Sequence, residues 1–187
     1  MKKSIKIFQI SFFVCFVAFV LIQFSSCKKQ NEAINEVTIK WNITIDGQDY
    51  SYEEILSEED DFENGVAILQ TNSGISNGGS QLILSSSDGG MLTVQFGHVN
   101  MTDEGSYVFN GDMDGSLSIM NNMDSYSDAL GIGASTTLTI TTFPAVSAST
   151  SEMLQETLVI GEFSGTVGDF NDVLHNISGS FEAIRIQ

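Results

Sequence analysis

The most regular pattern in the chain is an alternation of apolar and polar residues that begins at Val37. The apolar positions are Val37, Ile39, Trp41, Ile43 and Ile45, and the residues between them are polar. A period of two places successive side chains on opposite faces of an extended chain. The pattern therefore predicts a half-buried strand over residues 37–45, with Trp41 packed in the core.

The residues after this strand predict a hairpin. Asp46-Gly47 is a common two-residue turn, and Tyr50 and Tyr52 lie two apart on the returning segment. Ser51 and Glu54 have the spacing of a helix capping box. Residues 51–63 are therefore predicted to form either a short helix or an acidic loop.

Short segments rich in apolar and β-branched residues continue to the end of the chain, and glycine-rich turns separate many of them. The segments are 66–71, 81–86, 92–96, 107–110, 116–120, 136–143, 157–167 and 177–186. Many short strands with a single proline predict an all-β domain. The expected architecture is an antiparallel β-sandwich, and a closed lipocalin-like β-barrel is the alternative.

The first 27 residues have the layout of a bacterial lipoprotein signal. Two lysines precede an apolar run over residues 5–24, and Ser25-Ser26-Cys27 follows. Cleavage before Cys27 would leave its thiol to carry acyl chains, which hold a protein on a bilayer when there are two or more. We predict a signal peptide at 1–26, a tether at 27–36 and one domain at 37–187. An uncleaved membrane anchor is the alternative.

The charge of the chain is strongly negative. It carries 24 acidic and 7 basic residues, for a net charge of −17, and Arg185 is the only basic residue after Trp41. Such a charge repels nucleic acid and anionic lipid headgroups, so nucleic acid is excluded as a partner. The acidic run 58–61 is expected to be a solvated loop, with cation or basic-partner binding as the alternative.

One segment resembles the start of a calcium-binding loop. Asn110, Asp112 and Asp114 place oxygen ligands at alternate positions, and Gly115 follows them. The twelfth position is Asn121 rather than a bidentate glutamate, and the flanks are predicted strands. A plain turn between strands, built from Asn, Asp and Gly, is the other interpretation. Calcium is the only cofactor that the sequence suggests.

Catalytic residues are not indicated. His98 and His175 are the only histidines, and neither lies in a motif for nucleophilic or zinc chemistry. Both are expected to be loop or surface residues. Among the aromatic residues, Tyr107 and Tyr126 have polar neighbours, which makes them the candidates for an exposed glycan-binding surface.

Several phrases of the sequence resemble a group of small lipoproteins common in Bacteroidota. The phrases are the opening strand into Ile45-Asp46-Gly47, the segment Gly161-Glu162-Phe163-Ser164-Gly165-Thr166-Val167 and the segment Ile177-Ser178-Gly179-Ser180-Phe181. The resemblance implies a single β-rich domain behind a lipoprotein signal, and it implies no catalytic residues.

These observations predict an outer-membrane lipoprotein held by Cys27, with its domain on the periplasmic face or the cell surface. Its expected role is non-enzymatic binding of an envelope glycan or a protein partner. The alternatives are a barrel that carries a small apolar ligand and a structural component of the envelope.

Overall fold

The computed structural model describes residues 36–57, 66–71, 79–86, 92–148 and 154–186, except for residues 113, 123 and 131. The predicted signal peptide, Cys27 and the acidic run 58–61 lie outside these ranges. Within them no helix is long and apolar enough to cross a membrane. The elements are β1 (Glu36–Ile45), β2 (Gln48–Ser57), β3 (Val66–Gln70), β4 (Ser80–Ser85), β5 (Leu92–His98), β6 (Gly105–Phe109), β7 (Gly115–Asn121), β8 (Asp124–Ser127), β9 (Ser135–Thr142), a 3-10 helix (Leu154–Thr157), β10 (Leu158–Gly168) and β11 (Leu174–Ile186).

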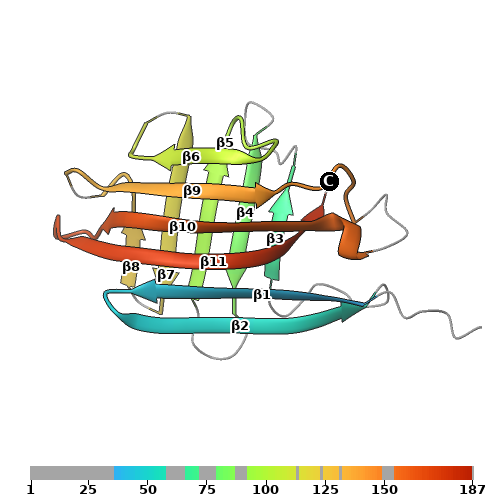
Figure 1. Ribbon diagram of the computed structural model, residues 1–187. Helices are drawn as coiled ribbons and strands as arrows, with labels where there is room; N and C mark the ends of the chain where they lie inside the picture. The colour runs from blue at the N-terminus through green and yellow to red at the C-terminus, as the bar shows by residue number, and fades with distance from the viewer. Residues whose placement is uncertain are drawn as a thin grey trace, which may run out of the picture. The chain divides into compact units, whose positions relative to one another are not determined.

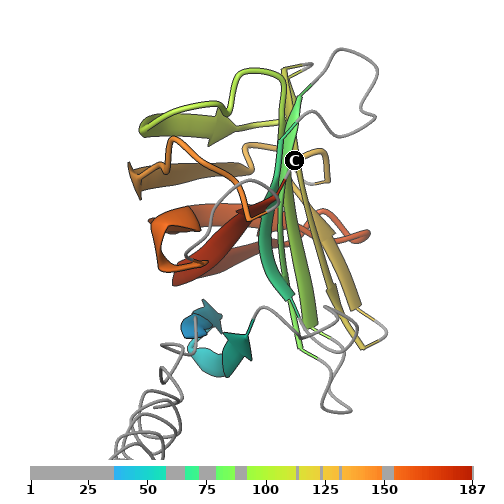
Figure 2. The ribbon, with the colours of Figure 1, turned by 90° about the vertical axis from the view of Figure 1, so that its right-hand side faces the viewer.

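The strands form two layers that cross at a wide angle, as Figure 1 shows. The front layer has the order β2-β1-β11-β10-β9-β6, and the back layer has the order β3-β4-β5-β7-β8. Figure 2 shows the two layers from the side. The end of β11 pairs with β3, and Gly168 of β10 pairs with Ser127 of β8, so the two layers belong to one sheet. This confirms the predicted all-β fold.

One pairing differs from the antiparallel prediction. The last residues of β11 run parallel to β3, with Ile184 opposite Ile68. A parallel pair needs a long connection between its strands, and here most of the domain lies between β3 and β11. The parallel junction allows β11 to leave the front layer and continue along the edge of the back layer.

The core lies between the layers and contains the alternating residues that the sequence indicates. Val37, Ile39, Trp41, Ile43 and Ile45 are all buried. Trp41 is 3% exposed, and its Nε1 donates a hydrogen bond to the carbonyl of Ser85 at 3.3 Å. In the centre the ring of Phe96 lies 5.2 Å from Phe109 and 5.1 Å from Phe163, between ring centroids. Contacts of this kind add to the energy of burial.

Two glycines and two phenylalanines form crossed pairs between β10 and β11. Gly161 lies opposite Phe181, and Phe163 lies opposite Gly179. A Cβ atom on Gly161 would stand 2.6 Å from Cζ of Phe181, and one on Gly179 would stand 2.6 Å from Cζ of Phe163. Each ring therefore covers the glycine of the opposite strand. This packing explains why Gly and Phe recur two residues apart in both segments.

Two segments differ from their predicted structure. Residues 51–57 continue the strand β2, so the helical interpretation was wrong for that part of 51–63. The short strand β8 was not predicted, because Asp124–Ser127 has no apolar alternation. It is placed by long-range contacts, including its pairing with β7 and the single bridge to β10.

Candidate functional site

The outward face of the front layer carries aligned rows of polar side chains. Inward positions of these strands are apolar, so the residues between them face outward. The register of the strands brings one residue from each strand into a row. The central row is Ser51 on β2, Asn42 on β1, Ser180 on β11, Glu162 on β10 and Thr139 on β9.

Two further rows flank the central row. One contains Glu53, Lys40, Glu182 and Ile160. The other contains Asp49, Thr44, Ser178, Ser164 and Thr137. All of these strands face the viewer in Figure 1. Five adjacent strands at about 4.8 Å spacing give the two five-residue rows a length of about 19 Å.

The face is hollowed along these rows into two adjoining depressions. One has a volume of about 260 Å³ and a lining that is both polar and apolar: Lys40, Trp41, Asn42, Ser51, Tyr52, Glu53, Ile160, Gly161, Ser180, Phe181 and Glu182. The other has a volume of about 380 Å³ and is lined by Asn42, Thr137, Thr139, Glu162, Phe163, Ser164, Ser178, Gly179 and Ser180. Asn42 and Ser180 belong to both, so we treat the two depressions as one outer-face groove.

The polar groups in the outer-face groove are held in place by short contacts. Nζ of Lys40 lies 2.9 Å from a carboxylate oxygen of Glu182, and this hydrogen bond raises the pKa of Lys40. Oδ1 of Asn42 accepts a hydrogen bond from the main-chain N–H of Ser180 at 3.3 Å. The groove thus offers hydroxyl, amide, carboxylate and ammonium groups from rigid strands, and it holds no nucleophile paired with a histidine.

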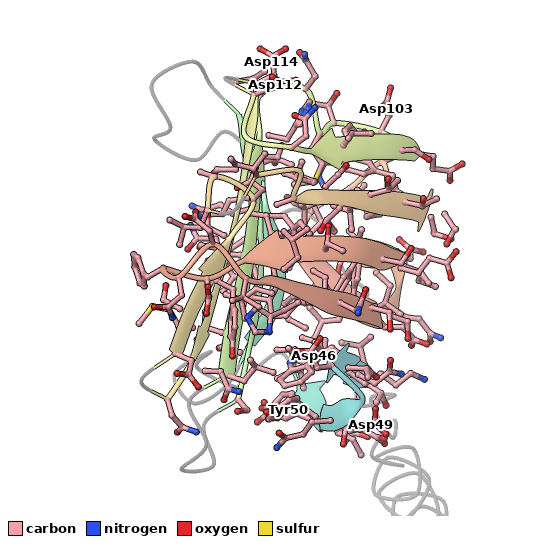
Figure 3. All side chains as sticks on the ribbon, turned by 90° about the vertical axis from the view of Figure 1, so that its left-hand side faces the viewer. Asp46, Asp49, Tyr50, Asp103, Asp112 and Asp114 are labelled. Atoms are coloured by element: carbon pink, nitrogen blue, oxygen red, sulfur yellow. The ribbon has the colours of Figure 1, made fainter. Side chains whose placement is uncertain are left out.

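The predicted calcium ligands lie in the turn between β6 and β7. Oδ1 of Asn110 accepts a hydrogen bond from the main-chain N–H of Asp112 at 3.2 Å, which is the geometry of an Asx turn. Figure 3 shows Asp112 and Asp114 together at this turn. Within the described ranges, no group of three Asp, Glu, His or Cys residues is arranged to hold a metal ion. The bond between Asn110 and Asp112 is the contact that the turn interpretation predicts, and calcium binding by Asn110, Asp112 and Asp114 stays a prediction.

A buried carboxylate anchors this turn. Asp128 is 4% exposed, and its two oxygens accept hydrogen bonds from the N–H groups of Gly111 at 3.1 Å and Leu117 at 2.9 Å. The hydroxyl of Ser127 lies 3.3 Å from Oδ1 of the same carboxylate. Asp128 therefore supplies acceptors for main-chain donors that the strands leave unpaired.

The expectation that Tyr107 is exposed was wrong. Its side chain is 8% exposed, and its hydroxyl donates to the carbonyl of Asp103 at 2.8 Å. Burial raises the pKa of this hydroxyl. The ring of His98 packs edge-on against Tyr107 and Phe109, and burial lowers the pKa of His98. The polar residues around Tyr107 suggested exposure, but one of them, Asp103, accepts the hydrogen bond of the buried hydroxyl. A polar neighbour can therefore accompany a buried tyrosine.

Tyr126 of the β7–β8 hairpin lies in a cluster with residues of the β1–β2 and β10–β11 hairpins. Its ring is half-buried and packs edge-on against His175, with 4.8 Å between ring centroids. Nδ1 of His175 lies 2.7 Å from Oδ2 of Asp46, and Nε2 lies 3.6 Å from Oδ2 of Asp169. His175 thus joins the β1–β2 turn to the β10–β11 turn, rather than lying free on the surface. Figure 3 shows Asp46 and Tyr50 close together in this region.

The carboxylates beside His175 predict a loss of stability in acid. The hydrogen bond with His175 lowers the pKa of Asp46, and the main-chain N–H of Val173 is the largest cause that lowers the pKa of Asp169 to about 2. A folded-state pKa below the unfolded value gives stability at neutral pH that is lost as pH falls through the folded value. For Asp169 that window runs from 3.8 down to about 2.

Asp169→Asn tests this dependence. We expect the variant to melt at a lower temperature than the parent at pH 7, and the difference should shrink as pH falls from 4 to 2.5. Asp172→Asn is the matched control, since it changes the same turn and asparagine tolerates the positive φ of 61° found there. If the melting temperatures of Asp169→Asn and the parent differed as much at pH 2.5 as at pH 7, the predicted acid dependence would be wrong.

Comparison with known proteins found no relative of this chain. No family model, no curated protein and no solved structure matched the chain. The residues of the outer-face groove are therefore the basis for a functional argument. Their sequence signal was the polar half of the alternating pattern, for example Asn42, Thr139 and Ser180, but only the register of the strands shows that they lie together.

Proposed function

We propose that the protein is a lipid-anchored, non-enzymatic binding module of the outer membrane, and that it binds a glycan in the outer-face groove. The observation that carries this proposal is the alignment of hydroxyl, amide and carboxylate side chains from five strands along one hollowed face. Sugar hydroxyls donate and accept hydrogen bonds, and this lining offers both kinds of partner. Groups on strands are positioned more rigidly than groups on loops.

The charge of the groove indicates which glycans fit. Glu53, Glu162 and Glu182 contribute three negative charges, against one positive charge from Lys40. The chain as a whole carries a net charge of −17. This field repels uronic-acid and sulfated polymers. Neutral glycans, and amino-sugar glycans with free amines, are the expected ligands.

The anchor in this proposal is Cys27, through acyl chains attached after cleavage of the signal peptide. Cys27 lies nine positions before Glu36, where β1 begins, and nine extended residues reach about 30 Å. The domain would therefore stay close to the bilayer, on the periplasmic face or the cell surface. Cys27→Ala should abolish labelling by a fatty-acid analogue in growing cells, and labelling that persists would contradict the anchor.

Three alternative functions have less support. A carrier of an apolar ligand needs a cavity between the layers, and the region there is filled by contacting rings such as Phe96, Phe109 and Phe163. A purely structural envelope component requires no hollowed polar face. A hydrolase with a histidine-activated nucleophile also has less support, because the partners of His175 are carboxylates and His98 accepts a main-chain N–H from Asn100.

Binding to a panel of polysaccharides tests the glycan proposal. The panel contains neutral glucans, mannans and xylans, chitosan oligomers and the anionic polymer alginate, each titrated calorimetrically into the purified protein. We expect a neutral or amino-sugar polymer to bind and alginate not to bind. Asn42→Ala and Glu162→Gln should each weaken binding about three- to tenfold, which corresponds to the loss of one hydrogen bond.

Gln95→Ala is the control for these variants, because Gln95 lies on β5 between the inward-facing Val94 and Phe96, and so faces outward from the opposite layer. It should leave the affinity unchanged. All three variants should keep the melting temperature of the parent. Absence of binding to every polymer at millimolar saccharide, or equal affinity in all variants, would refute the glycan proposal.

A further inference from the structure

The turn between β10 and β11 presents a group of apolar side chains to solvent. Phe170 is 75% exposed, and Val173 and Leu174 are 50% and 43% exposed. The other exposed large hydrophobic residues that the structure describes, Ile55, Val108, Met120 and Ile132, are scattered over other elements. Isolated exposed apolar residues are normal, but a cluster around one aromatic ring is typical of an interaction site.

The β10–β11 turn is held in one conformation by its own hydrogen bonds. Oδ1 of Asp169 accepts the N–H groups of Asn171 at 2.8 Å and Val173 at 2.9 Å, and Oδ2 accepts Nδ2 of Asn171 at 3.2 Å. The main chain closes the turn through a bond from the N–H of Asp169 to the carbonyl of Val173 at 3.0 Å. Phe170 is therefore carried by a braced turn rather than by an open loop.

The turn is also fixed to its neighbours. His175 joins it to Asp46 of the β1–β2 turn, and Asp46 and Asn176 exchange further hydrogen bonds of 2.8 and 3.0 Å. The ring of Tyr126 on β8 packs against His175. A main chain that is already ordered loses little conformational entropy when it binds, so the braced turn favours Phe170 as a binding anchor.

The charge around the turn indicates the kind of partner. Asp46, Asp169 and Asp172 lie in or beside it, and Asp124 contributes to the electrostatic environment of the neighbouring Tyr126. The described lysine and arginine are engaged elsewhere: Lys40 pairs with Glu182, and Arg185 donates to the carbonyl of Pro144. His175, between Asp46 and Asp169, is the described basic residue at the turn. An acidic rim repels anionic lipid headgroups and also a second copy of the same acidic surface. It attracts a basic protein surface.

We propose that the β10–β11 turn is a protein-docking surface, in which Phe170 inserts into an apolar pocket of a partner protein and Lys or Arg residues around that pocket face the acidic rim. The turn lies at the end of the front layer opposite to Glu36, where the chain enters the domain (Figure 1). The docking surface is separate from the outer-face groove, because none of its residues line that groove. Its test is therefore independent of glycan binding.

Site-specific photocrosslinking in intact cells of the native host tests this surface with the full-length lipoprotein. A benzophenone amino acid is placed at Val173, beside Phe170. A second variant carries it at Val108 on β6, which has nearly the same exposure, 51% against 50%, and is the matched control. We expect the Val173 probe, and not the Val108 probe, to crosslink to one protein. Mass spectrometry should map the crosslink to a segment of that protein rich in Lys or Arg.

The combination of the Val173 probe with Phe170→Ser decides whether Phe170 is the anchor. The crosslinked product should fall by roughly tenfold or more, as for the loss of a central aromatic anchor. The melting temperature should not change, because Phe170 is mostly exposed. A product that persists without Phe170, a crosslink to lipid, a crosslink between two copies of this chain, or the absence of any product would each overturn the proposal.

Discussion

Replacing Gly161 by alanine is expected to lower the free energy of unfolding by about 3 kcal/mol, as for overpacking in a tightly packed core. The added Cβ atom would stand 2.6 Å from Cζ of Phe181 and 2.6 Å from the carbonyl oxygen of Thr139. The ring can move only by displacing other core residues, and the carbonyl belongs to the neighbouring strand β9. Urea unfolding of the purified domain, with the midpoint and slope fitted separately, measures the change.

Ser164→Ala is the control for Gly161→Ala. Ser164 lies three residues further along β10, is exposed and points outward, so its variant should unfold within about 0.5 kcal/mol of the parent. If Gly161→Ala unfolded at the same urea concentration as Ser164→Ala, the crossed glycine–phenylalanine packing would be refuted as a determinant of stability.

Asp128→Ala is expected to have a comparable effect through lost hydrogen bonds. The change leaves the N–H groups of Gly111 and Leu117 without their acceptor, and Leu117 is fully buried. Gly111 is exposed, so water can replace the lost acceptor there, whereas the buried donor of Leu117 stays unsatisfied, which costs about 1–3 kcal/mol. Thermal and urea unfolding should both show the loss. Asp128→Asn keeps one acceptor oxygen and should lose less stability than Asp128→Ala.

Asp112→Ala is the control in the same turn. The bond with Asn110 uses the main-chain N–H of Asp112, and its side chain is exposed, so the variant should stay within about 0.5 kcal/mol of the parent. The same variant separates the turn interpretation from a calcium site. Calcium binding would make the melting temperature of the parent rise with calcium and would remove that rise in Asp112→Ala.

The strands that the sequence predicted are those with an apolar alternation. β1 is the clearest case, since Trp41 and the other alternating apolar residues of this strand are all buried on one face. β8 was missed because its four residues are polar or aromatic without a period. Long-range pairings, such as that of β11 with β3, depend on how the layers close, and no local pattern records them.

The candidate site was predictable only in part, for the same reason. The outward positions of Asn42 and Ser180 follow from alternation, but their position side by side follows from the register of β1 against β11. Tyr107 and Tyr126 have similar sequence surroundings, yet Tyr107 is buried and Tyr126 is half-exposed. Both rings pack edge-on against a histidine, His98 and His175 respectively, so the difference in burial comes from the rest of the fold around each ring.

The central position of β11 has a consequence for how the chain is made. β11 pairs with β1, β10 and β3, and it contains the final 13 residues that the structure describes. A ribosome releases the earlier residues first, so β1 emerges long before β11, the strand that completes its pairing. Contacts between the two ends of a chain close slowly. The edges of β1, β3 and β10 that pair with β11 therefore stay open until β11 has been made, and pairing of β11 is the step that joins them.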